Sequence, residues 1–358
     1  MSAATGALAA DRARRALGEL LDRVAVTRAE VGDRFPLYAD PRTGRWVTTG
    51  RGSWTGGFWA GLLWLRARRT GLPDDRAAAA ACTARLAGWV EADTSTRGLI
   101  LWYATALAAP DAAARELRTR AARAALSALD PRLGLVPWGS AFGGPRLLAR
   151  VDGVPGMVPL LAAAGPRGAE AAASHLHRHL DLCLREDGAL VPARLFTDGA
   201  GWRPYEDPPA GWSRGRAWLL LAAADALHRP AVPRGTPDGL YGAAERLAAP
   251  WTYPRAPLVP PADETRPDGP LDTSAAAITA LALLKLARVP GPRAPEHARR
   301  AAAILERLVG AHLSRGRLLD GCYDARKGVA VRHESVWGDF FLALALAGLT
   351  GLVDVREV

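Results

Sequence analysis

Lysine and cysteine are scarce in this chain of 358 residues, and their scarcity excludes several classes of protein. Lysine occurs only at Lys285 and Lys327, so almost all of the positive charge behind the formal net charge of +10 comes from arginine. No run of basic residues and no basic stripe with interleaved aromatic residues accompanies this charge, which argues against a nucleic-acid partner. The arginine excess reflects either a compositional bias of the source or a positive field that attracts small anionic ligands.

Signals for disulfides, metal binding and membrane insertion are also missing. Cys82, Cys183 and Cys322 are odd in number and far apart, so they form neither a disulfide framework nor a CxxC metal site. We expect them in the core of a protein from a reducing compartment. The longest apolar stretches, such as residues 217–227, are too short to cross a bilayer, and the first residues lack the apolar segment of a secretory signal. We therefore expect a cytoplasmic protein with no membrane partner.

Motifs for common cofactor and metal chemistry do not occur. The chain has no GxxxxGKS or GxxxxGKT phosphate loop, no GxSxG turn and no HExxH pair. His175, His177 and His179 resemble a metal cluster, but on a helix His177 lies opposite the other two and no carboxylate stands at ligand spacing. We interpret this segment as the solvated face of an outer helix, and we expect neither a metal nor a cofactor.

What the chain has in abundance is helical periodicity, because apolar residues recur at intervals of three and four while alternating strand patterns are nearly absent. Clusters of Gly and Pro divide the chain into segments. We predict twelve helical segments, at residues 6–31, 56–70, 74–92, 97–109, 111–128, 153–164, 167–186, 212–228, 238–249, 272–288, 294–313 and 335–350.

These segments alternate in character, which predicts the fold. The odd-numbered segments are polar on one face, whereas the even-numbered ones are apolar nearly all round and must be buried on every side. Six of each predict an all-α (α/α)6 toroid, a single domain over residues 1–358 in which residues 1–35 supply the first outer helix and the N-terminal segment. A two-domain helical protein or an open superhelix is the alternative, but no polar linker divides the chain.

Unusual residues gather where the predicted inner helices begin. If these helices run parallel, their starts meet at one end of the toroid, and six helix N-termini there favour an anionic ligand. The longest loops, at residues 129–152, 187–211 and 250–271, lead to the same end. We expect these loops to form the walls of a pocket.

Four residues at this end are candidates for chemistry, although each also has a structural interpretation. Asp152 is either the N-cap of a helix or a general acid/base. Asp272 has the pattern of an N-cap, and Asp339 is suited to capping or to holding a neighbouring arginine. Arg214 precedes a wholly apolar stretch, and a buried arginine needs a carboxylate partner, either from the protein or from a ligand.

Four segments resemble those of a known enzyme family. They are residues 54–65 (WTGGFWAGLLWL), 212–218 (WSRGRAW), 272–278 (DTSAAAI) and 335–341 (SVWGDFF). Their order and approximate spacing, from about residue 36 to residue 349, resemble glycoside hydrolase family 88, the unsaturated glucuronyl hydrolases. Residues 152–159 also resemble the related family 105, the unsaturated rhamnogalacturonyl hydrolases.

The resemblance implies an unusual reaction, in which an Asp protonates C4 of a 4,5-unsaturated uronic acid and activates water for attack at C5. It implies that Asp152 is this acid/base, that Arg214 lies near the substrate carboxylate, and that Trp59 and Trp218 line the sugar site. The hemiketal formed by hydration then collapses and releases the neighbouring sugar.

The chain also departs from the family pattern. Thr96 stands where the resemblance implies a second Asp, and Arg216 stands where it implies Gln. The family's His before the Trp-Arg segment has no counterpart here. Which of Asp93, Asp339 or Glu334, if any, takes the place of the missing carboxylate is left open by the sequence.

We therefore predict a hydrolase that acts on an unsaturated glucuronide or a related small anionic sugar, with Asp152 as its catalytic residue. The predicted substrate-binding residues, which include arginine clamps and aromatic walls, are Trp54, Trp59, Thr96, Arg97, Trp102, Trp212, Arg214, Arg216, Trp218, Trp337 and Asp339. Two alternatives remain: a tailoring enzyme that applies acid–base chemistry to another small metabolite, and a sugar-binding protein that has lost catalysis.

Overall fold

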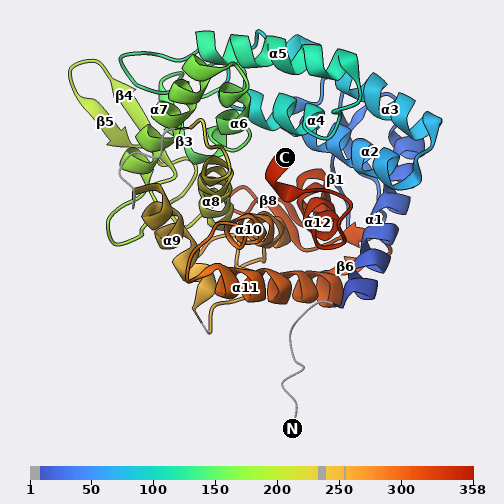
Figure 1. Ribbon diagram of the computed structural model, residues 1–358. Coiled ribbons are helices and arrows are strands. Elements are labelled where there is room, and N and C mark those ends of the chain that lie inside the picture. The colour runs from blue at the N-terminus through green and yellow to red at the C-terminus, as the bar shows by residue number, and fades with distance from the viewer. Residues whose placement is uncertain (1–8, 233–238, 254) are drawn as a thin grey trace.

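The protein is an all-α (α/α)6 barrel, in which a ring of inner helices is wrapped by a ring of outer helices (Figure 1). The computed structural model describes residues 9–232, 239–253 and 255–358. The outer helices are α1 (Ala10–Val31), α3 (Pro73–Ala84), α5 (Ala112–Ser127), α7 (Pro166–Cys183), α9 (Gly239–Thr252) and α11 (Ala294–Arg307). The inner helices are α2 (Gly56–Thr70), α4 (Tyr103–Thr105), α6 (Met157–Ala162), α8 (Ser213–Leu227), α10 (Thr273–Leu286) and α12 (Val336–Leu349).

Burial explains why each helix belongs to its ring. The inner helix α8 is buried at every residue, whereas the outer helix α11 buries only His297, Ala301, Ile304 and Leu305. The predicted alternation is confirmed, because a helix of the inner ring is surrounded by other elements and needs apolar residues on most of its sides. No helix in the described ranges is both long and apolar enough to cross a membrane.

Several helix boundaries differ from the predicted ones. The segment predicted at 153–164 becomes helical only at Met157, because Gly156 adopts a left-handed conformation with φ of 69°. The segment predicted at 97–109 begins as the π-helical stretch η3 (Gly98–Trp102) and continues as α4. Residues 6–8 and 238 of the predicted helices lie outside the described residues.

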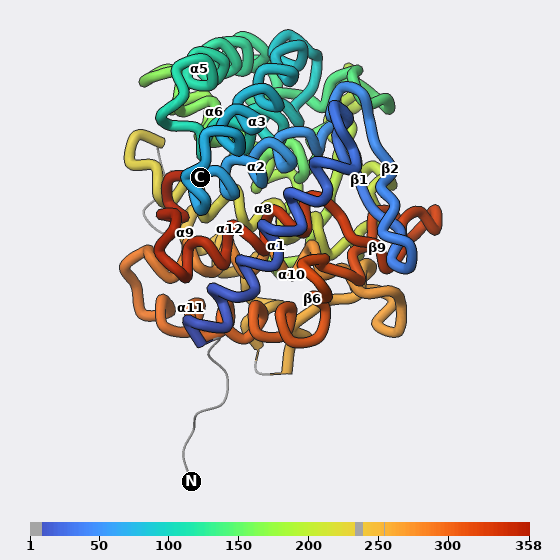
Figure 2. The backbone as a smooth tube through the Cα atoms, turned by 90° about the vertical axis from the view of Figure 1, so that its right-hand side faces the viewer, coloured from blue at the N-terminus to red at the C-terminus, as the bar shows by residue number. Residues whose placement is uncertain are grey.

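Short strands occur in the loops that precede the inner helices, and the sequence did not predict them. One sheet has the order β2-β1-β9-β8 and another the order β3-β4-β5, while β6 and β7 form a hairpin. Figure 2 shows β1, β2 and β9 together at one end of the barrel. Their lengths, two to seven residues, are too short to show a clear alternation of polar and apolar positions. The strands are β1 (Phe35–Ala39), β2 (Trp46–Thr49), β3 (Leu148–Arg150), β4 (Ala193–Thr197), β5 (Gly201–Pro204), β6 (Leu313–Ser314), β7 (Arg317–Leu318), β8 (Gly321–Asp324) and β9 (Val329–Ser335).

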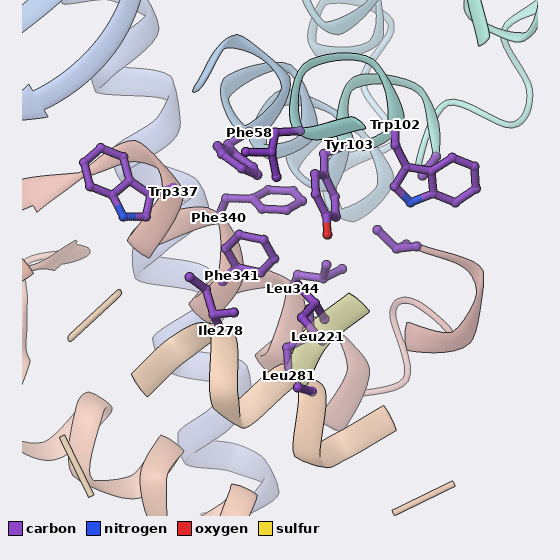
Figure 3. Packing of buried hydrophobic residues seen from close by; sticks show 14 of the residues in the cluster. Phe58, Trp102, Tyr103, Leu221, Ile278, Leu281, Trp337, Phe340, Phe341 and Leu344 are labelled. Atoms are coloured by element: carbon purple, nitrogen blue, oxygen red, sulfur yellow. The ribbon is translucent and has the colours of Figure 1, made fainter. Parts of the chain in front are cut away.

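Aromatic rings fill the middle of the barrel. Figure 3 shows Phe58, Tyr103, Phe340 and Phe341 in contact, and their ring centroids lie 5.1 to 5.5 Å apart. Phe58 also stacks on Trp218, with the two rings 6.1 Å apart and within 11° of parallel. Large rings at such distances leave little room for a ligand, so the barrel has a packed centre.

Close backbone packing between the first two inner segments makes Gly57 sensitive to substitution. A Cβ atom at this position would lie 2.2 Å from the carbonyl oxygen of Leu99 and 2.4 Å from that of Ile100. We expect Gly57→Ala to lower the free energy of unfolding by about 1–3 kcal/mol, measured by urea denaturation, because backbone atoms must shift. Gly88→Ala is the matched control, since a Cβ there meets nothing within 4 Å. Equal stabilities for the two variants would contradict this packing.

Candidate active site

A pocket of about 630 Å³ opens where the inner helices begin. Each of the three long loops that were predicted to form its walls contributes to the lining, through residues that include Trp138, Asp207 and Asp263. A further wall, residues 322–327 of the β8–β9 hairpin, was not predicted. The predicted convergence of the loops and the inner-helix starts at one end of the toroid is confirmed.

Asp152 lies in this pocket and forms a two-pronged ion pair with Arg150. It belongs to the short helical turn η4 (Val151–Gly153), directly after the strand β3 that carries Arg150. The guanidinium donates from Nε to Oδ1 over 3.0 Å and from Nη2 to Oδ2 over 2.9 Å. The two side chains are only 14% and 16% exposed, and Arg150 also lies 4.1 Å above the ring of Trp138. Both carboxylate oxygens of Asp152 are therefore engaged by the protein itself.

The charges around Arg150 keep its guanidinium protonated. Burial lowers the pKa of Arg150, but the negative charges of Asp152 and Asp207 raise it by more than burial lowers it. The pKa of Arg150 therefore lies above its ordinary value. Asp207 lines the same pocket, yet it has no hydrogen-bond or ion-pair partner among the described residues. Arg150 is thus a permanent cation that is paired with Asp152 and also acted on by the charge of Asp207.

His175 supports the turn that carries Asp152, and a second buried histidine, His179, bonds to the His175 carbonyl oxygen. His175 accepts a hydrogen bond at Nδ1 from the Val136 N–H (3.1 Å), so its Nε2–H donates to the Gly153 carbonyl oxygen (3.3 Å). Burial holds the pKa of His175 well below its ordinary value and lowers that of His179 to about 4, so both rings are neutral. The interpretation of this helix face as solvated is wrong, because α7 packs it against the pocket turn. No group of three or more metal-ligating side chains forms in the described ranges.

Arg214, at the start of α8, is buried and already has protein partners. It forms an ion pair with Asp272 and donates to the carbonyl oxygens of Cys322 (2.6 Å) and Tyr323 (2.8 Å). Its side chain is only 4% exposed, and its guanidinium lies 5.1 Å from the ring of Trp212. The carboxylate that a buried arginine requires therefore comes from the protein, which leaves little of this guanidinium for a ligand.

Asp272 has the capping role that its position predicts, together with a second role that the sequence did not reveal. It is fully buried, and its Oδ1 accepts hydrogen bonds from the backbone N–H groups of Ser274 (3.0 Å) and Ala275 (3.4 Å) at the start of α10. Its other oxygen pairs with Arg214. One carboxylate thus caps one inner helix and neutralises the arginine of the preceding one.

Half of the twelve predicted site residues line the pocket, namely Trp54, Thr96, Asp152, Trp212, Arg214 and Trp218. Trp54 stacks on Tyr323, with ring centroids 6.1 Å apart, and donates from Nε1 to its hydroxyl (3.3 Å). The hydroxyl of Thr96 is paired with that of Thr94 at 2.8 Å. The pocket is therefore walled by indole rings. It contains the neutral side chain of Thr96 at the position where the family resemblance implies a second Asp.

The other six, Trp59, Arg97, Trp102, Arg216, Trp337 and Asp339, do not line the pocket. Arg97 donates to the backbone carbonyl oxygens of Ala92 (2.6 Å) and Ala124 (3.3 Å). Arg216 donates to the Gly188 carbonyl oxygen over 2.9 Å and pairs with Glu264 at 3.5 Å. The prediction that these two arginines clamp an anion needs correction, because the protein backbone and Glu264 already occupy their guanidinium groups.

The corrections for two tryptophans follow from helix packing. The ring of Trp102 packs against the guanidinium groups of Arg118 and Arg229, which are 5.8 and 4.8 Å from its centroid. Trp337 is fully buried behind Trp54, with ring centroids 5.1 Å apart, so it supports the pocket wall from the rear.

Trp59 and Asp339 instead adjoin a small space beside α1, together with Glu334. Asp339 is not an N-cap, because Ser335 fills that position by accepting from the Gly338 N–H. Asp339 accepts from the Leu318 N–H (3.1 Å), and Glu334 rather than Asp339 pairs with Arg317 (2.8 Å). The orientation of α12 turns this carboxylate away from the pocket.

The buried pair of Asp339 and Glu334 predicts a pH-dependent stability. Burial and the nearby charge of Glu334 hold the pKa of Asp339 well above its ordinary value. A carboxyl whose pKa is raised in the folded state contributes stability below its unfolded pKa of about 4 and loses it as the pH rises through the raised folded value. Asp339→Asn keeps an acceptor for Leu318 and removes this ionisation. In urea titrations from about pH 4 to pH 8, we expect the variant to gain stability relative to the wild type as the pH rises. Parallel curves would contradict it.

Several pocket residues escaped the sequence analysis. Arg150 stands two positions before Asp152, and this close spacing was the one signal available for it in the sequence. Asp207 and Phe142 lie in loops without a recognisable pattern, and Tyr323 and Lys327 belong to the β8–β9 hairpin, which was not predicted.

Comparison with known proteins relates the whole chain to one group of enzymes. No protein-family model matches it. It is 25% identical to the unsaturated glucuronyl hydrolase of Bacillus sp. (strain GL1), in an alignment that covers 94% of this chain and 97% of that protein. A solved structure of UGL with an Asp-to-Asn substitution and dGlcA-Glc-Rha-Glc has a TM-score of 0.84 at 25% identity, covering 94% of this chain and 96% of the other. The chain is a homologue of the unsaturated glucuronyl hydrolases.

Unsaturated glucuronyl hydrolases of lower identity share the fold. The enzyme from Streptococcus agalactiae has a TM-score of 0.84 at 18% identity, covering 97% of this chain and 94% of that one. One described as specific for heparin has a TM-score of 0.83 at 19% identity, covering 97% of this chain and 100% of the other. The 25% identity to the Bacillus enzyme makes the chain an enzyme of the glycoside hydrolase kind and confirms the resemblance drawn from the four sequence segments.

The family resemblance implies an Asp at the position of Thr96. None of the three candidates Asp93, Asp339 and Glu334 supplies a carboxylate to the pocket in its place. Asp93 lies outside the pocket, where it accepts from Ser140 and from Arg146 (2.9 Å). Asp339 and Glu334 face α1. Within the described ranges, the pocket carboxylate with no hydrogen-bond or ion-pair partner is Asp207, on a different loop.

Proposed function

We propose that the protein hydrates the C4=C5 double bond of a 4,5-unsaturated uronic acid at the end of a small glycoside, and so releases the neighbouring sugar. The observation that carries this proposal is the position of Asp152 in a pocket walled by Trp54, Trp212 and Trp218. The homology to unsaturated glucuronyl hydrolases, one of them described with dGlcA-Glc-Rha-Glc, supports the substrate class.

The size and lining of the pocket suit such a ligand. A volume of about 630 Å³ falls within the range of small-molecule sites, roughly 300–1,000 Å³. Indole rings present flat apolar faces on which sugar rings stack. The packed aromatic centre below Trp218 closes the pocket at its base, so the substrate enters from the loop end and its terminal residue lies deepest.

In the proposed reaction, Asp152 acts first as an acid and then as a base. Its carboxyl proton is transferred to C4, and the electron pair of the double bond forms the new C4–H bond. A water molecule adds its oxygen to C5 and gives its proton to the Asp152 carboxylate, which restores the acid. The C5 hemiketal then opens to a C5 ketone and a free hydroxyl on C1. The resulting C1 hemiacetal collapses to an aldehyde, its hydroxyl proton passes to the leaving oxygen, and the neighbouring sugar leaves as an alcohol. Asp152 is the residue of this pocket that the family resemblance assigns to both transfers.

The test is the conjugated chromophore of the substrate, whose ultraviolet absorbance disappears when the double bond is hydrated. The purified protein should remove this absorbance from an unsaturated uronyl disaccharide, with stoichiometric release of the second sugar. A wild-type protein that binds the disaccharide without consuming it would instead be a sugar-binding protein that has lost catalysis. Thr96, in the place of a family Asp, is the observation that favours this second candidate.

A further inference from the structure

We propose that Arg150 is the residue that binds the carboxylate of the uronic acid, and that its transfer from Asp152 to the substrate frees Asp152 for proton transfer. This inference rests on the proposed function, because it concerns the same pocket and the same acid. It differs from the role that the family resemblance implies for Arg214.

The first support is the pairing of the Asp152 carboxylate with Arg150. Each of its oxygens accepts an N–H of Arg150, over 3.0 and 2.9 Å. A protonated carboxyl would have to turn its O–H against one of these donors, so Asp152 cannot hold a transferable proton while the pair is intact. Catalysis by Asp152 therefore requires Arg150 to move.

The second support is that other cations are poorly placed to replace Arg150. Arg214 is engaged by Asp272 and two carbonyl oxygens, and only 4% of its side chain is exposed. Arg266 is 78% exposed at the edge of the pocket, and Arg326 is exposed in the turn between β8 and β9. Lys327 pairs with Asp324 at 3.3 Å. Arg150 is buried, and its planar guanidinium donates two parallel hydrogen bonds to Asp152, the proposed acid. The same geometry suits a substrate carboxylate equally well.

The third support is the surface on which Arg150 lies. Its guanidinium sits 4.1 Å above the ring of Trp138, a contact that persists when the plane of the guanidinium slides or turns. The charge of Asp207 also acts on this guanidinium, so Arg150 remains a cation after it leaves Asp152. When Arg150 exchanges the carboxylate of Asp152 for that of the substrate, it therefore remains paired with a negative charge.

The exchange has a consequence for protons. Once Arg150 binds the substrate carboxylate, Asp152 is an unpaired carboxylate beside a second anion. A nearby like charge and the loss of an opposite one both favour the protonated form. Asp152 therefore takes up a proton from solvent as the substrate binds, and this is the proton that it delivers to C4.

The experiment measures binding and proton uptake with glucuronic acid, a saturated uronate that has no double bond to hydrate. Titration calorimetry in buffers of different ionisation enthalpy should show uptake of up to one proton per bound glucuronate near neutral pH. Arg150→Gln should weaken binding about 10- to 100-fold, with Arg150→Lys in between because it keeps the charge without the fork. Asp152→Asn should bind glucuronate without proton uptake. Arg146→Gln, whose partner Asp93 lies outside the pocket, is the matched control.

Kinetics with an unsaturated disaccharide separate this role from a merely structural one. Arg150→Gln should raise KM by a similar factor while kcat falls by no more than a few-fold, because Asp152 is no longer held by a cation. Equal affinity of wild type and Arg150→Gln for glucuronate, or binding without proton uptake, would overturn the inference even if the wild type is active. Absence of turnover in a wild type that binds glucuronate with proton uptake would overturn the proposed function alone.

Discussion

Asp152→Asn is expected to lower kcat for an unsaturated uronyl disaccharide about 10²- to 10⁴-fold, the range typical of a lost general acid–base catalyst. Asn has nearly the same shape, but it can neither give a proton to C4 nor accept one from water. Because the substitution also releases Arg150 from its ion pair, KM should be no higher than that of the wild type. The measurement is the rate at which the absorbance of the double bond disappears, at several substrate concentrations.

Asp93→Asn is the control for this variant. Asp93 is close to Thr96 in sequence, but it lies outside the pocket and pairs with Arg146. Its substitution should leave kcat within about twofold of the wild type. If Asp152→Asn retained wild-type activity, Asp152 would not be the acid, and the unpaired Asp207 would become the carboxylate to test.

The second large effect concerns stability rather than rate. Asp272→Ala is expected to lower the free energy of unfolding by about 3–5 kcal/mol, because it leaves the guanidinium of Arg214 buried without a carboxylate. The same substitution removes the N-cap of α10, which adds to the loss. Urea denaturation monitored by circular dichroism measures this difference. Thermal unfolding of the variant should show a correspondingly lower midpoint.

Asp111→Ala separates the two contributions. Asp111 caps α5 by accepting from the Ala114 N–H (2.7 Å), but it has no arginine partner among the described residues. Its loss should therefore cost about 1 kcal/mol, the value of a cap alone. A similar loss for both variants would mean that the ion pair between Asp272 and Arg214 contributes nothing to stability.

Much of the helical fold followed from the sequence because burial leaves a local pattern. A segment such as residues 217–224 is apolar on every side, which is typical of an inner helix, whereas residues 294–307 have a single apolar stripe. Breaks were harder to place, since the left-handed Gly156 shortens α6 in a way that periodicity does not show. The strands were missed because two to seven residues carry too little pattern.

The location of the candidate site was predicted correctly, but only some of the residues that line it were. The helix starts that carry Trp54, Asp152 and Arg214 do meet at one pocket, because parallel inner helices bring their first residues together. Trp59 lies five positions from Trp54, yet it faces α1, since the rotation of α2 about its axis directs the indole of Trp59 away from the pocket. The sequence gives the composition of each helix face but leaves the direction of that face to packing.

The sequence by itself determined the alternation of inner and outer helices and the end of the barrel at which chemistry is concentrated, because both depend on local periodicity and on where helices begin. Only the tertiary structure decided the pairing of charges. Asp272 neutralises Arg214 from 58 positions away in the sequence. Arg150, at the end of β3, forms a bidentate ion pair with Asp152. Such pairs form where low-dielectric burial makes an unpaired charge costly, and burial at one point is set by every helix around it.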